Sequence, residues 1–266
     1  MKEHNMCLTV LGARGSLPVS DTKRSRFGGA TSCYMVHAGS ETIFLDGGTG
    51  LVSAPAQFEK TPVILLSHLH LDHLIGLGMY PRLSQDGTIT RLLFRADTED
   101  EMRALLQQLF SPPFWPIPLT EYKGTLLLEP LAPILKIGDV TVESMEGRHP
   151  GGCLVFRLKY GDKRLVYATD CEPDDPFFSK LISFCDGADL LLYDGQFTEK
   201  DSITKKGFGH STAEKGVELM ERCGAKRLLL IHHDPQASDE ELLRIFMQTP
   251  PPSAAALTKQ PQQSGD

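Results

Sequence analysis

Long hydrophobic runs are missing from this sequence of 266 residues. No apolar stretch approaches the roughly 20 residues that a membrane-spanning helix requires, and the N-terminus lacks the apolar segment of a secretory signal. We therefore expect a cytoplasmic protein with no membrane partner. Hydrophobic residues nevertheless make up 41% of the chain, which excludes a mostly disordered protein and allows a sizeable core.

Positive charge is also scarce, since 27 Lys and Arg residues face 34 Asp and Glu residues and the formal net charge is −7. Broad nucleic-acid binding depends on neutralising many phosphates, so we expect no stable nucleic-acid partner. One small nucleotide held by metals is still compatible with this charge. The six cysteines form no C-x-x-C pair and match no zinc-ribbon spacing, which favours small buried hydrophobic residues over a disulfide framework.

Short strand-like runs, each apolar or β-branched and bounded by turn residues, dominate both halves of the chain. They predict strands at residues 7–11, 32–38, 42–46, 63–67, 140–144, 153–160, 164–168, 190–193 and 227–231. Helices are predicted at 98–109 and 212–223. This order suggests two sheets face to face with helices outside. We expect one domain over 1–247 and a disordered tail over the proline-rich, polar residues 248–266.

A proline-rich segment at residues 111–118 contains the only tryptophan, Trp115. Four prolines in eight residues exclude both a helix and a central strand, so this segment is predicted to be a stiff surface loop. Such a loop can be a hydrophobic plug over the core or a lid over a pocket, and the sequence leaves both alternatives open.

The strongest motif is HLHLDH at residues 68–73, which follows an apolar run and therefore lies where a buried strand leaves its sheet. Residues two apart in an extended chain point the same way, so His68 and His70 can bind one metal together. Asp72 and His73 lie just past the bend and can turn toward a second metal. Imidazole and carboxylate are ligands that zinc prefers, with manganese or iron as alternatives. This density of ligands favours a metal site over a set of surface histidines.

Three further candidate ligands lie at the ends of predicted strands, namely His149, Asp170 and His232. A carboxylate that closes an apolar strand is costly to leave unpaired, so Asp170 is a candidate to bridge two cations. A helix cap or a turn residue is the alternative for Asp170. His232 is preferred over His233 because His232 directly extends its strand, whereas His233 would face the opposite side.

HLHLDH, followed by single His, Asp and His residues at strand ends, resembles the metallo-β-lactamase fold superfamily of binuclear hydrolases over about residues 6–235. The resemblance implies an α/β fold, an αββα sandwich of two mixed sheets flanked by helices, with the site at the edge between the sheets. It also implies two divalent metal ions, with Zn2+ expected and Mn2+ as the alternative. The implied ligands are His68, His70 and His149 for one metal and Asp72, His73 and His232 for the other, with Asp170 as the bridge.

A second motif narrows the branch of this superfamily. The GHSTA sequence at residues 209–213 and the LLYDG sequence at 191–195 look like the phosphodiesterase branch that includes ribonuclease Z and phosphonate-pathway cyclic phosphodiesterases. In that branch a histidine at this place, paired with an acidic residue, contacts the phosphate and assists the leaving group. His210 and Asp194 match those places, although ribonuclease Z has a longer glutamate. The implied catalytic residues are His210 as general acid, Asp194 as its partner and Asp72 as the group that orients water.

These features predict a binuclear-metal phosphodiesterase that hydrolyses a small nucleotide, with a 3′,5′-cyclic nucleotide as the expected substrate. The resemblance also implies a homodimer. A ribonuclease Z-like RNA endonuclease is an alternative, but a predicted strand pair fills the short interval between His149 and Asp170, where ribonuclease Z inserts its basic tRNA-binding arm. A thioester, lactone or β-lactam hydrolase and a non-catalytic metal-binding module are further alternatives. His210 and Asp194 argue against the other hydrolases, and the complete ligand set argues against the module.

Overall fold

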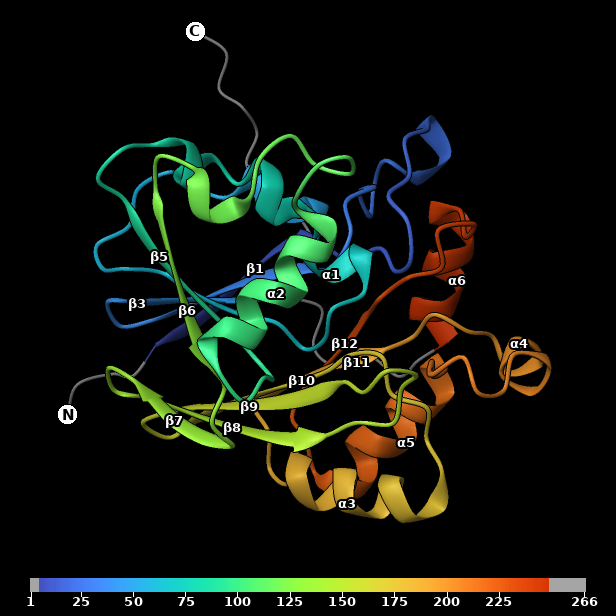
Figure 1. Ribbon diagram of the computed structural model, residues 1–266. Coiled ribbons are helices and arrows are strands. Elements are labelled where there is room, and N and C mark those ends of the chain that lie inside the picture. Colours follow the sequence, from blue (N-terminus) through green and yellow to red (C-terminus); the bar gives the residue numbers. More distant parts are fainter. Residues whose placement is uncertain (1–4, 249–266) are drawn as a thin grey trace, which may run out of the picture.

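The structure is a computed structural model that describes residues 5–248, and two six-stranded sheets lie face to face at its centre (Figure 1). The first sheet has the order β1-β2-β3-β4-β5-β6, and the second has the order β12-β11-β10-β9-β8-β7. The first sheet comprises β1 (Met6–Gly12), β2 (Cys33–Ala38), β3 (Glu41–Leu45), β4 (Val63–Leu65), β5 (Ile89–Phe94) and β6 (Thr125–Pro130). The second comprises β7 (Ile134–Ile137), β8 (Val140–Glu146), β9 (Leu154–Tyr160), β10 (Lys163–Ala168), β11 (Leu190–Asp194) and β12 (Leu228–Ile231).

Both sheets are mixed, and their parallel portions position the site. In the first sheet β3, β4, β5 and β6 run parallel, whereas β1, β2 and β3 pair antiparallel. In the second sheet β10, β11 and β12 run parallel, and β7 to β10 pair antiparallel. Parallel strands bring their carboxyl ends to one edge of a sheet, where ligands of open α/β sheets usually bind. Six of the seven candidate ligands follow β4, β10 and β12 at these edges, and His149 lies in the loop between β8 and β9.

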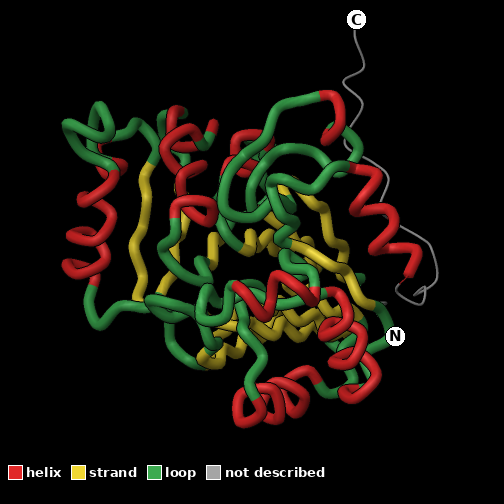
Figure 2. Tube along the Cα trace, turned by 90° about the vertical axis from the view of Figure 1, so that its right-hand side faces the viewer, coloured by secondary structure: helices red, strands yellow, loops and turns green. Residues whose placement is uncertain are grey.

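Helices cover the outer faces of both sheets (Figure 2). The helix α2 (Glu99–Leu109) packs beside β6 of the first sheet. On the second sheet α3 (Asp175–Cys185) packs against α5 (Ala213–Cys223), which also contacts β11 and β12. The other helices are α1 (Leu71–Leu74), α4 (Glu199–Thr204) and α6 (Asp239–Gln248). Across the part of the chain that the structure describes, every helix is too short or too polar to cross a bilayer.

The core has three apolar layers because successive side chains of each strand point to opposite faces. Ile43 and Leu45 of β3 point into the layer between the sheets, whereas Phe44 points outward into the layer beneath α2. In the same way Leu192 of β11 faces the central layer, and Tyr193 faces the layer beneath α3 and α5. Strands buried on both faces read as continuous apolar runs, which explains why they stand out in the sequence.

The expected α/β fold class, an αββα sandwich of two mixed sheets, is confirmed. Several elements were not predicted: β5, β6, β7, α3, α4 and α6. The helix α6 reaches Gln248, the first residue of the predicted disordered tail, and the rest of that tail lies outside the described residues. The cysteine prediction is wrong for Cys7, which is exposed on the edge strand β1, whereas the other five cysteines are buried.

The proline-rich segment is a plug over the outer core of the first sheet. The Nε1 of Trp115 donates a hydrogen bond of 2.8 Å to the hydroxyl of Tyr122, and this hydroxyl donates one of 2.8 Å to the carbonyl of Gly78. The Trp115 ring also meets the ring of Phe110 edge to face at 5.5 Å. Phe114 of the same segment stays exposed. Trp115 thus joins the hydrophobic cluster beneath α2. Of the two alternatives that the sequence leaves open, this packing favours the plug over the core.

Candidate metal centre

The candidate site begins where the strands end with a sharp backbone turn. Asp46 after β3, Asp170 after β10 and His232 after β12 all adopt a left-handed backbone, with φ of 63°, 50° and 58°. This conformation is unfavourable for residues other than glycine and is often found at functional sites. The backbone turns abruptly at each of these three residues. Their side chains therefore do not follow the up-and-down alternation of a strand, and they point into the space between the two sheet edges.

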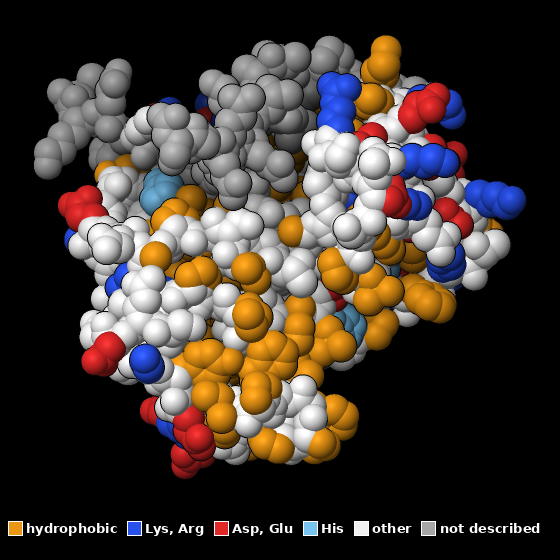
Figure 3. Space-filling view, turned by 90° about the horizontal axis from the view of Figure 1, so that it is seen from above, with side chains coloured by type: hydrophobic (Ala, Val, Ile, Leu, Met, Phe, Trp, Pro, Cys, Tyr) orange, Lys and Arg blue, Asp and Glu red, His pale blue; other side chains and the backbone are white. Residues whose placement is uncertain are grey.

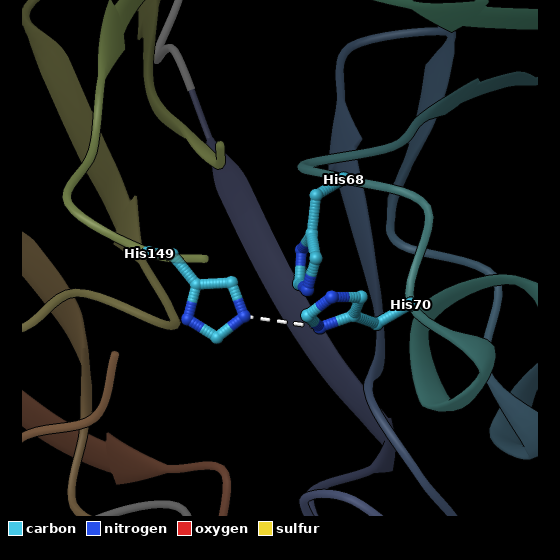
Figure 4. A group of neighbouring side chains, drawn as sticks. All are labelled: His68, His70 and His149. Carbon is cyan, nitrogen blue, oxygen red and sulfur yellow. Dashed lines mark hydrogen bonds between the residues drawn. The ribbon is translucent and has the colours of Figure 1, made fainter. Parts of the chain in front are cut away.

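One group of predicted ligands consists of His68, His70 and His149, whose ligand atoms all lie within 4.8 Å of one another. Figure 4 shows the three imidazoles turned toward a common point, with His149 approaching from the opposite side of the site to His68 and His70. The Nε2 of His149 lies 3.0 Å from the Nδ1 of His70. The structure therefore brings these residues together from the first sheet and from the loop between β8 and β9.

A second group consists of Asp72, His73 and His232, all buried. The Nε2 of His232 lies 3.0 Å from Oδ2 of Asp72 and 3.2 Å from the Nε2 of His73. Burial lowers the pKa of His232, but Asp170 and Asp72 outweigh burial and raise this pKa to about 9. Burial also lowers the pKa of His73. The carboxylates of Asp170, Asp46 and Asp72 outweigh burial and raise this pKa well above its ordinary value.

Asp170 lies between the two groups. Its Oδ1 is 3.8 Å from the Nε2 of His149 and 4.0 Å from the Nε2 of His68, and its Oδ2 is 3.3 Å from the Nε2 of His73. Burial raises the pKa of Asp170, but the imidazoles, with His232 foremost, hold it well below its ordinary range. An ionised carboxylate that faces both groups is arranged as a bridging ligand would be.

The residues present fit divalent cations. His68 Nε2 is buried and has no hydrogen-bond partner, although Ser67 Oγ lies 3.0 Å from its Nδ1. Burial lowers the pKa of His68, His70 and His149, which favours the neutral imidazole that metal binding needs. Burial opposes ionisation of Asp72, but His73 keeps the pKa of Asp72 far below its usual value. The neutral imidazoles of the first group beside the ionised Asp170 form a donor set typical of zinc, whereas His73 and His232 would release a proton on binding a cation.

Asp46 is a functional candidate that the sequence analysis missed. This fully buried carboxylate accepts hydrogen bonds from the backbone N–H and the hydroxyl of Ser67, at 2.6 and 2.8 Å, and from the hydroxyl of Tyr167, at 2.6 Å. It also accepts one from Nδ1 of His73 at 2.6 Å. This bond fixes the tautomer of His73 and leaves Nε2 free to face Asp72, as outer carboxylates do for metal-bound histidines.

The turn after β1 closes the site beside the second group. The backbone N–H of Ser16, which has a φ of 61°, donates a hydrogen bond of 2.6 Å to Oδ2 of Asp72. A Cβ at Gly15 would overlap the ring of His232, so only glycine lets the backbone approach that imidazole. The GARGS sequence at residues 12–16 therefore contacts two predicted ligands, Asp72 and His232.

The predicted His210–Asp194 pair is present at the edge of the site. The Nδ1 of His210 donates a hydrogen bond of 2.9 Å to Oδ2 of Asp194 and lies 3.6 Å from Oδ1 of Asp170. Asp194 is fully buried, and its oxygens also accept backbone N–H groups of Asp170, Gln196 and Ser211. The His210 ring stacks on that of His232 at 5.0 Å, so it directly adjoins the second ligand group.

His233 does not join the site. Its ring contacts those of Phe27 and Phe246, and burial lowers its pKa to about 3. The backbone N–H of His233 donates a hydrogen bond to the carbonyl of Ala13. This bond joins the turn after β1 to the end of β12. His232 thus faces Asp72 and the ligand groups, whereas His233 faces Phe27 and Phe246.

Comparisons with known proteins agree with this geometry. The sequence model of the family described as "Beta-lactamase superfamily domain" matches residues 41–233. The probable metallo-hydrolase YhfI of Bacillus subtilis is 28% identical over 238 residues, covering 85% of this chain and 86% of that protein. A ribonuclease Z of Bradyrhizobium is 26% identical over 284 residues, covering 85% and 88%.

The crystal structure of YhfI, a metallo-beta-lactamase fold protein, superposes with a TM-score of 0.69 at 24% identity and covers 91% of this chain and 92% of its own. The likeness shows that the two proteins share their fold. The family model begins at β3 and therefore leaves out β1 and β2, but it includes all seven predicted ligands, from His68 to His232. The chain therefore belongs to the beta-lactamase superfamily, and its strand-end cluster of histidines and aspartates lies within the matched domain.

Proposed function

We propose that this protein is a binuclear metal-dependent phosphodiesterase that hydrolyses a small nucleotide, specifically a 3′,5′-cyclic nucleotide. The observation that carries the proposal is the His210–Asp194 pair beside the two ligand groups, because a proton donor at this place suits an alkoxide leaving group. The relatives support the coarser assignment, since one is described as a metallo-hydrolase and another as a ribonuclease.

Two divalent cations, Zn2+ in our proposal, would be held by the two ligand groups with Asp170 between them. The ligands are His68, His70 and His149 in one group and Asp72, His73 and His232 in the other. When bound, such cations supply Lewis acidity toward a phosphoryl oxygen and make water a nucleophile near neutral pH.

The protein's own residues supply orientation and proton transfer. Because Nδ1 of His210 donates to Asp194, the proton for a leaving 3′ oxygen would come from Nε2 of His210. Asp194 cannot turn away, since three backbone N–H groups hold its oxygens. Asp72, whose Oδ2 is fixed by the N–H of Ser16, is placed to orient the attacking water.

A small substrate is supported by the connection between the two middle ligands. The strand β9 ends at Tyr160 and β10 begins at Lys163, so a tight turn is all that protrudes between His149 and Asp170. The formal net charge of −7 also disfavours a polyanion that needs many phosphate contacts.

The ribonuclease Z relative supports a second candidate function, an RNA endonuclease that cleaves precursor tRNA. The same metal ligands and the same His210–Asp194 pair would serve this reaction. The two functions differ in how much of the substrate the protein must contact outside the metal centre.

The test is a substrate screen of the purified, zinc-loaded protein. It compares 3′,5′-cyclic purine and pyrimidine nucleotides, bis-p-nitrophenyl phosphate, a precursor tRNA and a thioester. Turnover of a cyclic nucleotide is the expected result. Cleavage of precursor tRNA with no cyclic-nucleotide turnover would favour the second candidate. Activity on the thioester alone would overturn both.

Two expectations about context remain predictions. Light scattering after size-exclusion chromatography tests the homodimer, and cell fractionation tests the cytoplasmic location. A monomer or a membrane-bound protein, respectively, would contradict them.

A further inference from the structure

Glu172, two residues beyond Asp170, uses one carboxylate oxygen to hold a turn that borders the site. Its Oε2 accepts a hydrogen bond of 2.7 Å from the backbone N–H of Gly207 and one of 3.2 Å from the N–H of Gly209. Two backbone N–H groups of the turn thus converge on one side-chain oxygen of Glu172. This contact joins two segments that lie 35 residues apart in the chain.

The turn that Glu172 holds can be formed only with glycine. Gly207 and Gly209 have φ of 89° and 88°, values that other residues rarely adopt. A Cβ at Gly209 would also overlap Nδ1 of His149. Phe208, between the two glycines, is 63% exposed, so the turn is not held by burial of its own side chain. The Glu172 carboxylate therefore holds the turn together with one backbone hydrogen bond of 3.2 Å, from the N–H of Phe208 to the carbonyl of Lys205.

The turn at residues 207–209 contacts a predicted metal ligand, His149. The carbonyl of Gly209 lies 3.1 Å from Nδ1 of His149 and accepts its hydrogen. The opposite ring nitrogen, Nε2, then faces His70 at 3.0 Å and Asp170 at 3.8 Å. A hydrogen bond at one ring nitrogen fixes the tautomer and the direction in which the other nitrogen can bind a metal.

Glu172 also fixes the backbone next to His149. The N–H of Glu172 donates a hydrogen bond of 2.9 Å to the carbonyl of Arg148. The backbone of residue 172 thus sets the position of the His149 main chain, and its side chain sets the ring orientation through the turn. Both contacts come from a residue outside every ligand group that the described residues form.

We infer that Glu172 is a positioning residue: its carboxylate holds the turn at residues 207–209, and the Gly209 carbonyl in that turn holds the imidazole of His149 toward the metal centre. The inference rests on the proposed function only in taking His149 as a metal ligand. It does not depend on the identity of the substrate.

Two trypsin cleavage sites, after Lys205 and after Lys206, lie directly before the turn and report on its mobility. We compare wild type, Glu172→Ala and Glu172→Gln by limited trypsin digestion with mass-spectrometric mapping, and we measure Zn2+ affinity by chelator competition. The visible spectrum of the Co2+-substituted protein reports the ligand geometry. Glu199→Gln is the control, since it removes one negative charge from the neighbouring helix α4.

For Glu172→Ala we expect cleavage after Lys205 or Lys206 to be roughly tenfold faster. We also expect Zn2+ affinity to fall by about 10–100-fold and the Co2+ spectrum to change. Glu172→Gln, which keeps an acceptor oxygen, should restore part of all three properties, and it carries the test if the alanine variant does not fold. Glu199→Gln should match wild type.

Unchanged metal affinity in a Glu172→Ala protein whose turn is cleaved faster would overturn the link to His149. Weaker metal binding with an unchanged turn would overturn the role of the turn, and no change in either would overturn the inference as a whole. A wild-type protein that binds no metal would instead refute the proposed function and, with it, the role of His149. None of these measurements uses a substrate, so failure to find an activity leaves them valid.

Discussion

His210 and Asp194 are joined by a hydrogen bond of 2.9 Å between Nδ1 and Oδ2, and the aspartate is held in turn by three backbone N–H groups. Two of these N–H groups belong to Asp170, a predicted ligand, and to Ser211, the neighbour of His210. The pair is therefore built into the same frame as the metal centre. Because Asp194 also holds the backbone of Asp170, a change at His210 is the better test of the proton-donor role apart from metal binding.

The substitution His210→Ala should lower kcat on a 3′,5′-cyclic nucleotide by about 10²–10⁴-fold, because the leaving oxygen loses its proton donor. The deficit should shrink on bis-p-nitrophenyl phosphate, whose p-nitrophenolate leaves without a proton. Metal content, measured by mass spectrometry, should stay at the wild-type level. The control is His37→Ala, since His37 contacts Thr42 on the β2–β3 hairpin. Loss of metal from His210→Ala would show that His210 is a ligand.

Purified protein should contain about two transition-metal ions per chain, as binuclear hydrolytic sites do. Removing them with a chelator should abolish activity and lower the melting temperature, because ligands that bind only the folded state stabilise it. Asp170→Asn keeps the size of the side chain but removes the charge that faces both groups, so we expect weaker metal retention and loss of turnover. Full activity in a metal-free preparation would refute the metal centre.

The substitution Asp46→Asn should lower Zn2+ affinity by about 10–100-fold, although Asp46 is not itself a proposed ligand. The reason is that Nδ1 of His73 loses its carboxylate acceptor. Tyr167→Phe is the matched comparison, because it removes one donor to Asp46 and leaves the charge in place. Its effect on affinity should be the smaller of the two. Equal affinities of Asp46→Asn and wild type would contradict this role.

The pH dependence of the free energy of unfolding should include a contribution from the carboxylate of Glu143 on β8. Burial raises the pKa of Glu143, but Lys159 and Arg157 outweigh burial and hold this pKa below the ordinary value of a glutamate. A lowered folded-state pKa stabilises the protein above the unfolded-state pKa, and the benefit is lost as the pH falls through the folded-state pKa. Glu143→Gln should therefore reduce the free energy of unfolding by roughly 1 kcal/mol at pH 7 and by less in acid.

The control for this prediction is Glu146→Gln on the same strand. Glu146 pairs with Arg95, but the side chains are 66% and 61% exposed, so its loss should change stability by less than about 0.5 kcal/mol. Denaturant titrations at pH 7 and pH 3.5 give both values. A difference between wild type and Glu143→Gln that grows toward low pH would reverse the assigned sign.

The elements that could be predicted from sequence are those with strong local patterns. The strands β3, β4 and β11 are buried on both faces and are continuous apolar runs in the sequence. The helix α5 has a threonine cap, Thr212, and a left-handed Gly224 at its end. By contrast β6 alternates buried and exposed residues and ends in Pro130, and β7 is four residues long, so their pairing depends on neighbours far along the chain.

The same distinction applies to the site. The HLHLDH motif concentrates four candidate ligands in one turn, and the other three lie at strand ends, where topology gathers them. Asp46 followed by glycine looks like any turn, and the contacts that give it a role come from His73, 27 residues away, and Tyr167, 121 residues away. Glu172 lies 35 residues from the turn that it holds. Residues that support ligands through long-range hydrogen bonds leave no local pattern.

The ligands come from both sheets: the HLHLDH motif follows β4 of the first, whereas Asp170 and His232 follow β10 and β12 of the second. Ions bound there would cross-link the two halves of the chain at the sheet edges where these ligands meet. Any movement that slides one sheet over the other would pull the ligands apart, so occupancy of the site and alignment of the sheets must rise and fall together.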